Sequence, residues 1–388
     1  MYDNYTLNSN LIITNKDEDN VCIFNNSNFS EVIIPSILFD ILTNLSPSIN
    51  HDTLFSHINN ETFISLLSNN IIIPTGSHNI FKFGLLNEKK GISSLSKPLS
   101  ILEFEDPRKW GIIGIDTYSN NDNGDLLMKP ATNIIRKCLK MYEKADTKEF
   151  IIDTNRKKIL KSKEVLPYDL GDILINNNYE NIQNLNDKIA FICETLFSLK
   201  MVPIFLGGGH DISYYLIKNI ISSTGKDINV IHFDAHTDRY DNSNNITRGN
   251  FMNHVANLEQ VKEIKHIGIR EFETKNNTIS FNNIITSFEL YLKNYNEVSF
   301  TSNDLPIYIT FDADIFDPIL AREVNYPVMG GPHYYDIFTI FEYICSRYNV
   351  IGADFVECFE NNEKYNYTAS LISNMITLLL NEGRTLYE

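Results

Sequence analysis

Four segments in the second half of the chain concentrate side chains that bind metals. They are Gly207-Gly208-Gly209-His210-Asp211, Asp234-Ala235-His236-Thr237-Asp238, Asp312-Ala313-Asp314 and the single residue Glu357. Each one follows directly after a short apolar run. Together they hold two histidines and at least five carboxylates, and both groups are ligands of divalent metal ions in proteins. A metal-dependent reaction is therefore the first hypothesis for this chain.

The apolar runs are predicted to be parallel strands that bring these segments together. After Pro107, short runs rich in Ile and Val alternate with longer amphipathic stretches, which indicates an α/β domain with a largely parallel sheet. In an open parallel sheet the ligand crevice lies outside the carboxyl ends of the strands, so all four segments should meet at one edge. The predicted strands are 111–115, 202–206, 229–233, 266–269, 283–285, 306–311 and 350–356, and the predicted helices are 187–199, 212–222, 252–264, 335–347 and 368–380.

The clustered carboxylates need positive charge beside them, because like charges raise each other's pKa and resist burial. In Asp234-x-His236-x-Asp238 and in Asp312-x-Asp314, alternate residues of an extended chain point to the same side. Oxygen-rich ligands with one imidazole per ion favour Mn²⁺ over zinc. Two such ions about 3.5–4 Å apart would hold a bridging hydroxide and polarise a substrate. Taken singly, the motifs also fit a glycine turn, a helix N-cap and an acidic turn, but their joint occurrence at successive strand ends favours a shared metal site.

The first 107 residues follow a different pattern and are predicted to form a separate module. The order of its elements predicts a small α+β module that is weakly similar to winged-helix modules. We therefore divide the chain into residues 1–107, the module with its linker, and residues 108–388, the catalytic domain. The predicted elements of the module are helices 34–45 and 60–67, a short strand 71–74 and a linker 93–107.

Composition and charge argue against several classes of partner. The formal net charge is −16 at pH 7, which repels phosphate backbones and disfavours nucleic acid as a partner. No apolar run approaches the roughly 20 residues that span a bilayer, and the N-terminus lacks the basic and apolar regions of a signal peptide. The five cysteines form no CxxC pair and are odd in number, which predicts buried thiols in a reducing compartment. We expect a cytoplasmic protein without a membrane or nucleic-acid partner.

The three metal motifs, in this order, resemble those of the ureohydrolases, the family that includes arginase, agmatinase and formimidoylglutamase. The resemblance implies a three-layer arginase-like domain, two Mn²⁺ per chain and a homo-oligomer. It also implies hydrolysis at the carbon of a guanidino or formimino group, with urea as the product from guanidino substrates. It covers about residues 108–388 and includes the segments 111–116, 129–130, 134–136, 169–173, 327–331 and 356–357.

The resemblance implies a role for each polar side chain at the strand ends. Asp234 and Asp312 would bridge the two ions, and Asp238 would be a ligand with a part in catalysis. Glu357 would orient the substrate, since a carboxylate pairs well with the planar donors of a guanidinium. His254, shortly after Gly249 and Asn250 in the sequence, would carry a proton to the leaving amine. The full ligand sets would be His210, Asp234, Asp238 and Asp312 for one Mn²⁺, and Asp234, His236, Asp312 and Asp314 for the other.

The residues that would select the substrate point to different compounds. Glu273 stands where arginases hold the α-amino group, which favours an arginine-like substrate. Tyr240 stands where arginases carry an asparagine for the α-carboxylate, and Arg239 could meet a carboxylate instead, which is nearer to formimidoylglutamase. A winged-helix-like module would fit a further substrate, an arginine inside a peptide that becomes ornithine. The alternative, which is favoured, is that the module serves in oligomerisation or as a lid. The sequence thus leaves open arginine, agmatine, formimidoylglutamate and peptidyl arginine.

Three other classes of protein remain as alternatives. A non-catalytic relative would have no reason to retain six metal ligands. A single-zinc deacetylase does not need the doubled set of carboxylates. A two-metal nuclease or phosphatase is disfavoured by the net charge of −16. The leading hypothesis is binuclear manganese-dependent hydrolysis of a guanidino group in a small substrate.

Overall fold

The computed structural model covers the 388-residue chain, and contacts between residues divide it into two compact units. The first unit consists of residues 1–87 with 98–100, and the second of residues 88–97 with 101–388. The residues that the structure describes are 4–7, 11–17, 19–25, 30–45, 49–50, 54, 57–59, 62, 65–66, 71–74, 86–87, 109–115, 129–139, 148–161, 165–173, 182–241, 243–271, 280–292, 300, 304–361, 363 and 365–387.

The first unit contains short strands, most of them paired antiparallel, and helix α1. Strand β1 pairs with both β5 and β6, and strands β2, β3 and β4 form a second sheet in that order. The buried core includes Val21 and Ile23 of β3, Ile34 of β4 and Leu42 of α1. The bounds are β1 (Asn4–Leu7), β2 (Leu11–Lys16), β3 (Asn20–Asn25), β4 (Ser30–Pro35), α1 (Ser36–Leu45), β5 (Ile49–Asn50), β6 (Ile72–Pro74) and β7 (Leu86–Asn87).

The sequence pattern predicts only part of this unit. Residues 34–45 do not form one helix, because β4 continues to Pro35 and α1 begins at the next residue. Ile34 pairs with β3, and Pro35 fixes φ and lacks an N–H, which suits the start of a helix better than the middle of a strand. The predicted strand 71–74 is present as β6, whereas β1, β2 and β3 are additional to the prediction. The predicted linker 93–107 and most of the predicted helix 60–67 lie outside the described residues.

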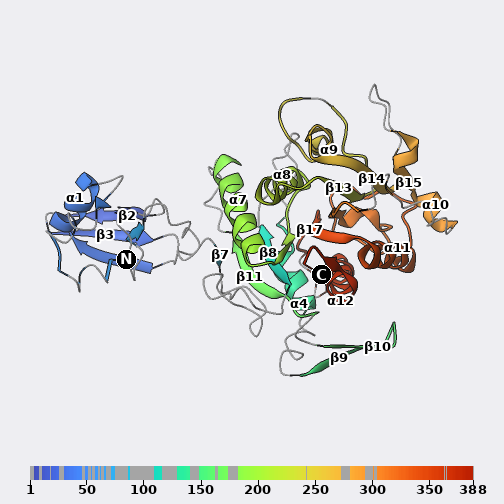
Figure 1. Cartoon of the computed structure of the whole chain (residues 1–388), viewed down its shortest axis with the longest axis horizontal. Helices are drawn as coiled ribbons and strands as arrows, with labels where there is room; N and C mark the ends of the chain where they lie inside the picture. Colours follow the sequence, from blue (N-terminus) through green and yellow to red (C-terminus); the bar gives the residue numbers. More distant parts are fainter. Residues whose placement is uncertain are drawn as a thin grey trace. The chain divides into compact units, whose positions relative to one another are not determined.

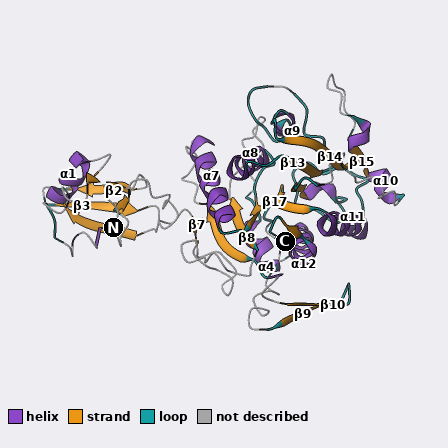
Figure 2. Cartoon of the chain, in the orientation of Figure 1, coloured by secondary structure: helices purple, strands orange, loops and turns teal. Residues whose placement is uncertain are grey.

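The second unit is built around a parallel sheet, as predicted (Figures 1 and 2). Its strands lie in the order β15-β14-β13-β16-β17-β12-β8-β11, every pairing between these neighbours is parallel, and β18 pairs with β17. The central strands are buried on both faces, which is why they appear in the sequence as continuous apolar runs. The bounds are β8 (Trp110–Ile115), β11 (Tyr168–Ile173), β12 (Val202–Leu206), β13 (Ile228–Phe233), β14 (Val261–Ile269), β15 (Ile284–Thr286), β16 (Ile307–Asp312), β17 (Asn349–Val356) and β18 (Arg384–Thr385).

Helices cover both faces of this sheet and give the unit three layers (Figure 2). Helices α7, α8 and α9 form one group of neighbours, and α4, α11 and α12 form another. Gly225 ends α8 with a left-handed φ of 62°, and the Asn366 side chain accepts the Ala369 N–H at the start of α12. The bounds are α4 (Thr132–Cys138), α7 (Ile182–Ser198), α8 (Ile212–Thr224), α9 (Phe251–Ala256), α10 (Ser287–Tyr291), α11 (Tyr334–Arg347) and α12 (Tyr367–Glu382).

The second unit differs from the predicted pattern in several places. The predicted helix 252–264 is wrong in its second half, because α9 ends at Ala256 and strand β14 begins at Val261. β14 pairs with β13 on one side and β15 on the other, and its Val and Ile residues suit that position. The hairpin of β9 (Phe150–Asp153) and β10 (Lys158–Lys161) is also additional to the prediction.

Two expected absences can be compared with the structure directly. No disulfide joins the five cysteines, all of which belong to the described residues. Cys193, Cys345 and Cys358 are buried, whereas Cys22 and Cys138 are partly buried. Within the described part of the chain, no helix has the length and apolar character needed to cross a membrane.

Candidate metal centre

The four ligand-bearing segments meet because their strands are neighbours in the sheet. Strands β13, β16, β17 and β12 lie side by side in that order and run in the same direction. Their carboxyl ends therefore lead into Asp234, Asp312, Glu357 and His210 along one edge. The Glu357 N–H donates to the Gly208 carbonyl at 2.9 Å, which ties the end of β17 to the glycine turn after β12.

The first cluster of side chains surrounds the Nδ1 atom of His210. This nitrogen lies 3.1 Å from the Oδ2 atom of each of three carboxylates, those of Asp234, Asp238 and Asp312. All four side chains are buried, the most exposed of them at 9%. A single N–H donates well to only one acceptor, so three equal distances fit a cation that the four groups hold in common.

The second cluster surrounds His236 and shares Asp234 with the first. His236 Nδ1 lies 3.3 Å from Asp234 Oδ1 and 3.0 Å from Asp314 Oδ2. Asp234 thus directs one carboxylate oxygen into each cluster, which is the geometry of a bridging ligand. The Asp314 N–H donates to Asp312 Oδ1 at 2.7 Å.

The negative charges in the two clusters lack sufficient positive charge beside them. Burial raises the pKa of Asp238 and of Asp314 to about 7, and neighbouring carboxylates add to the effect. Burial would lower the pKa of His236, but hydrogen bonds to Asp234 and Asp314 outweigh it and raise this pKa to about 12. Divalent cations between the carboxylates would remove the repulsion that these shifts report. The donor set therefore fits two such ions.

A buried chain of hydrogen bonds orients His210 from the side opposite the carboxylates. His210 Nε2 lies 2.9 Å from Thr310 Oγ1, and the Thr310 hydroxyl donates to Asp354 Oδ1 at 2.7 Å. Since the hydroxyl's only proton goes to Asp354, His210 Nε2 must be the donor in the first bond. When the ring is neutral, the lone pair of His210 is then on Nδ1, the atom that faces the three carboxylates. Metal-binding imidazoles are commonly held in this way.

Two further buried histidines support Asp234. His232 on β13 and His266 on β14 are register partners, and their Nδ1 atoms lie 2.9 Å apart. His232 Nε2 lies 2.9 Å from Asp234 Oδ2, and burial lowers the pKa of His232 to about 4. The neutral ring therefore donates to the carboxylate through Nε2, and His266 must donate to the lone pair on Nδ1. His232 also lies within reach of the first cluster, but this donated bond makes it a support of Asp234 and not a ligand.

Replacing His266 by leucine should weaken metal binding without changing a ligand. The variant removes the donor that fixes the tautomer of His232, and loss of a supporting hydrogen bond of this kind typically costs about 10- to 100-fold in metal affinity. His266→Asn is the matched control, because its amide N–H₂ can donate from nearly the position of Nδ1. Calorimetric titration with Mn²⁺ measures both variants. Equal affinities for the wild type and the leucine variant would contradict the supporting role.

Glu357 faces the first cluster from the end of β17. Its Oε1 accepts the backbone N–H of His210 at 2.9 Å. The φ of Glu357 is 56°, which is as unusual for a non-glycine residue as the φ of 51° at Asp238. Its Oε2 lies 3.5 Å from Nη1 of Arg248, a residue that the sequence motifs do not mark. Burial and Asp312 raise the pKa of Glu357 to about 8 against opposing effects of Arg248 and His210. A buried carboxylate thus lies beside the two clusters without being part of them.

His254, the predicted proton carrier, has different surroundings. It lies on α9, its Nε2 is 3.1 Å from the Ser243 carbonyl, and its ring packs edge-on against Tyr214. Within the described residues, none of these contacts is with a candidate ligand. In the segment that leads into α9, the structure places Arg248 against Glu357 instead.

The residues predicted to select the substrate are also engaged elsewhere. Tyr240 is 44% exposed and donates its hydroxyl to Glu271. Arg239 lies close enough to the buried pair His232 and His266 that its charge, after the larger effect of burial, helps to lower the pKa of both. The third residue, Glu273, lies outside the described residues.

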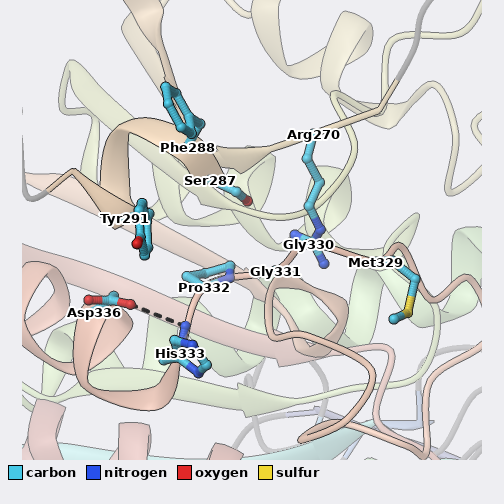
Figure 3. A pocket seen from close by; sticks show the side chains of 10 residues that line it. All are labelled: Arg270, Ser287, Phe288, Tyr291, Met329, Gly330, Gly331, Pro332, His333 and Asp336. Atoms are coloured by element: carbon cyan, nitrogen blue, oxygen red, sulfur yellow. Dashed lines mark hydrogen bonds between the residues drawn. The ribbon is translucent and has the colours of Figure 1, made fainter.

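A pocket of about 440 Å³ opens beside Arg270 (Figure 3). The Arg270 guanidinium donates to the backbone carbonyls of Asp314 and Val328, so it holds the loop after β16 in place. Figure 3 also shows Asp336 accepting the N–H of His333, at 3.2 Å. None of the lining residues is one of the six candidate ligands. They are Arg270, Ser287, Phe288, Tyr291, Met329, Gly330, Gly331, Pro332, His333 and Asp336.

The second unit, which carries these clusters, is similar to known proteins. Residues 110–380 match the model of the Arginase family. The chain is 27% identical to a human mitochondrial guanidino acid hydrolase over 57% of this chain and 65% of that protein. It is 27% identical to an agmatinase of Proteus mirabilis over 52% of this chain and 65% of that protein, so the match spans just under two thirds of either relative. The fold is similar to that of a hypothetical agmatinase from Burkholderia thailandensis, with a TM-score of 0.59, 20% identity and coverage of 72% of this chain and 86% of that one.

Proposed function

Because the chain belongs to the Arginase family, we propose that it uses two Mn²⁺ ions to hydrolyse the guanidino group of a small substrate and release urea. The observation that carries this proposal is the pair of ligand clusters that share Asp234, with Glu357 beside them. The names of the relatives, a guanidino acid hydrolase and an agmatinase, support a guanidino substrate.

The residues that would hold the two ions are those of the two clusters. The oxygen-rich donor set, with one imidazole per ion, favours Mn²⁺ over zinc. When bound, the ions supply a hydroxide nucleophile at neutral pH and polarise the carbon that is attacked. The proposed ligands are His210, Asp234, Asp238 and Asp312 for one ion, and Asp234, His236, Asp312 and Asp314 for the other.

The protein's own groups would orient the substrate and move the proton. Glu357 would accept the N–H donors of the guanidinium and hold its plane toward the clusters. Water adds across one C–N bond, so the carbon keeps two nitrogens and gains the oxygen of urea. Both protons of the water end on the third nitrogen, which takes up the first of them as the C–N bond breaks and leaves as an ammonium group. We assign the carriage of that proton to Asp238, whose carboxylate belongs to the first cluster, in preference to His254, whose contacts lie elsewhere.

The experiment that tests this function is urea release by Mn²⁺-loaded protein. The panel contains free arginine, agmatine, 4-guanidinobutyrate and an arginine-containing peptide. Urea from at least one compound supports the proposal, and the best substrate identifies the class. Formamide from formimidoylglutamate, without urea from the panel, would replace it with a formimino hydrolase. If the protein binds two Mn²⁺ but forms neither urea nor formamide, the result would contradict both kinds of hydrolysis and favour a non-catalytic relative.

Removal of divalent metal should lower the melting temperature as well as abolish activity. A ligand that binds only the folded state at 100 times its Kd stabilises that state by about 2.7 kcal/mol per site. For a chain of 388 residues, whose unfolding entropy is about 2.1 cal/mol/K per residue, one such site raises Tm by about 3 °C. Thermal unfolding after chelation, and again after Mn²⁺ is restored, measures the difference. An identical Tm with and without the metal would argue against a metal centre in the folded protein.

A further inference from the structure

The guanidinium group of Arg248 lies beside Glu357, the carboxylate that we propose binds the substrate guanidinium. Its Nη1 lies 3.5 Å from Glu357 Oε2, and its Cζ lies 5.0 Å from the centre of the Tyr326 ring. The contact with Glu357 is long and joins one nitrogen to one oxygen, unlike the bidentate fork of a strong arginine–carboxylate pair. The aromatic face of Tyr326 gives Arg248 a second anchor that does not depend on Glu357.

Exposure increases from the ligand clusters outward through Arg248. The Glu357 side chain is 5% exposed and that of Arg248 is 15% exposed. Tyr326, against which Arg248 stacks, is 45% exposed. Arg248 therefore lies between the buried clusters and solvent. A substrate whose guanidinium is held by Glu357 would extend past it.

A substrate guanidinium that binds at Glu357 would compete with Arg248 for this carboxylate. Both guanidinium groups are positive, and one carboxylate neutralises only one of them. A substrate that carries an ammonium group would add further positive charge beside Arg248. A substrate that carries a carboxylate would pair with it, because the arginine fork matches a carboxylate in shape and charge. In the complex, Glu357 would pair with the substrate guanidinium and Arg248 with the substrate carboxylate.

Two other arginines near the site have different contacts. Arg239 influences the buried pair His232 and His266, which lies behind Asp234. Arg270 donates to backbone carbonyls of the loop after β16. Of these three arginines, Arg248 is thus the one whose described contacts are with Glu357 and with the exposed ring of Tyr326.

We propose that Arg248 recognises a carboxylate on the substrate, so that the enzyme prefers guanidino acids to guanidino amines. This assignment rests on the proposed function and names the substrate class for the same site. The Tyr326 ring holds the plane of the Arg248 guanidinium. The N–H groups of Arg248 then exchange Glu357 for the substrate carboxylate.

The test compares three guanidines of similar length, 4-guanidinobutyrate, agmatine and butylguanidine, by their urea kinetics. For the wild type, kcat/KM for the acid should exceed that for the amine by more than about tenfold. Arg248→Met should remove most of this preference, mainly by raising KM for 4-guanidinobutyrate. Arg248→Lys keeps the positive charge and should retain part of the preference, although it loses the fork.

Arg322→Met is the matched control, because Arg322 also stacks on a tyrosine, with Cζ 5.1 Å from the Tyr367 ring. For this variant, the ratio of kcat/KM for 4-guanidinobutyrate to kcat/KM for agmatine should equal the wild-type ratio. A wild-type preference for agmatine, or a ratio unchanged by Arg248→Met, would overturn the assignment of Arg248 and leave the proposed function standing. Absence of urea from all three compounds, with two Mn²⁺ bound, would overturn the proposed function and this inference together.

Discussion

An Asp234→Asn protein is expected to bind less than one Mn²⁺ per chain and to form urea at least about 10³-fold more slowly. Asp234 directs Oδ2 to His210 Nδ1 at 3.1 Å and Oδ1 to His236 Nδ1 at 3.3 Å, so it serves both clusters. Asparagine keeps the shape but replaces one of these oxygens by an N–H₂ group that cannot bind a cation. It also removes the negative charge that His232 supports from behind. The two metal sites should therefore fail together.

Elemental analysis and the urea assay on the same preparation measure both effects. Asp227→Asn is the control, because Asp227 directly precedes β13, at the opposite end of the strand from Asp234, and forms an exposed ion pair with Lys262 at 3.1 Å. Such surface pairs contribute about 0–1 kcal/mol, so this variant should keep its metal and its activity. Two Mn²⁺ bound to Asp234→Asn would refute the bridging role.

The strands that carry the site were predictable because they are buried on both faces. A strand under two layers of helices has to be apolar throughout, so its sequence is a short continuous run. The predicted strand 202–206 has the bounds of β12, and 350–356 differs from β17 by one residue. The nine residues of β14 begin with apolar side chains at Val261, Ile264 and Ile267, a spacing of three that resembles an amphipathic helix. Only the pairing of β14 with β13 and β15 makes it a strand.

The meeting of the ligands was predictable from a rule about parallel sheets, but the order of the strands was not. β12 and β13 are consecutive in sequence yet lie apart in the sheet, with β17 and β16 between them. This order puts Glu357 next to the glycine turn before His210, through the bond from its N–H to Gly208. No local pattern contains that information, because strand pairing depends on the whole sheet.

The supporting residues and Arg248 could not be predicted because their contacts are made across elements or by a loop. His266 resembles any other polar residue in β14 until it is seen opposite His232. The loop before α9 is shaped by the Asn250 amide, which donates to Asp241, Ser243 and the Asn245 carbonyl. Motif spacing along such a loop does not fix the direction of a side chain, so it gave no sign that Arg248 contacts Glu357.

A Glu357→Gln protein should bind two Mn²⁺ normally but lose about 30- to 1,000-fold in kcat/KM for guanidino substrates. Glu357 accepts the His210 N–H at 2.9 Å and lies outside both ligand sets, so the neutral amide can keep that bond and leave the metals in place. The substrate, however, loses the charge of its partner in a buried site, and removing one member of such a pair typically costs about 2–4 kcal/mol. Metal analysis and steady-state kinetics separate the two effects.

Glu360→Gln provides the comparison for this variant. Glu360 follows three residues later and pairs with Lys129 at 2.9 Å on a more exposed part of the surface. The same change of charge there should leave kcat/KM within about twofold of the wild type. Kinetics of Glu357→Gln that match those of Glu360→Gln would remove Glu357 as the group that orients the guanidinium. Loss of metal from Glu357→Gln would instead indicate that Glu357 is a metal ligand. The assignment of Glu357 to the substrate site, outside both ligand sets, would then be wrong.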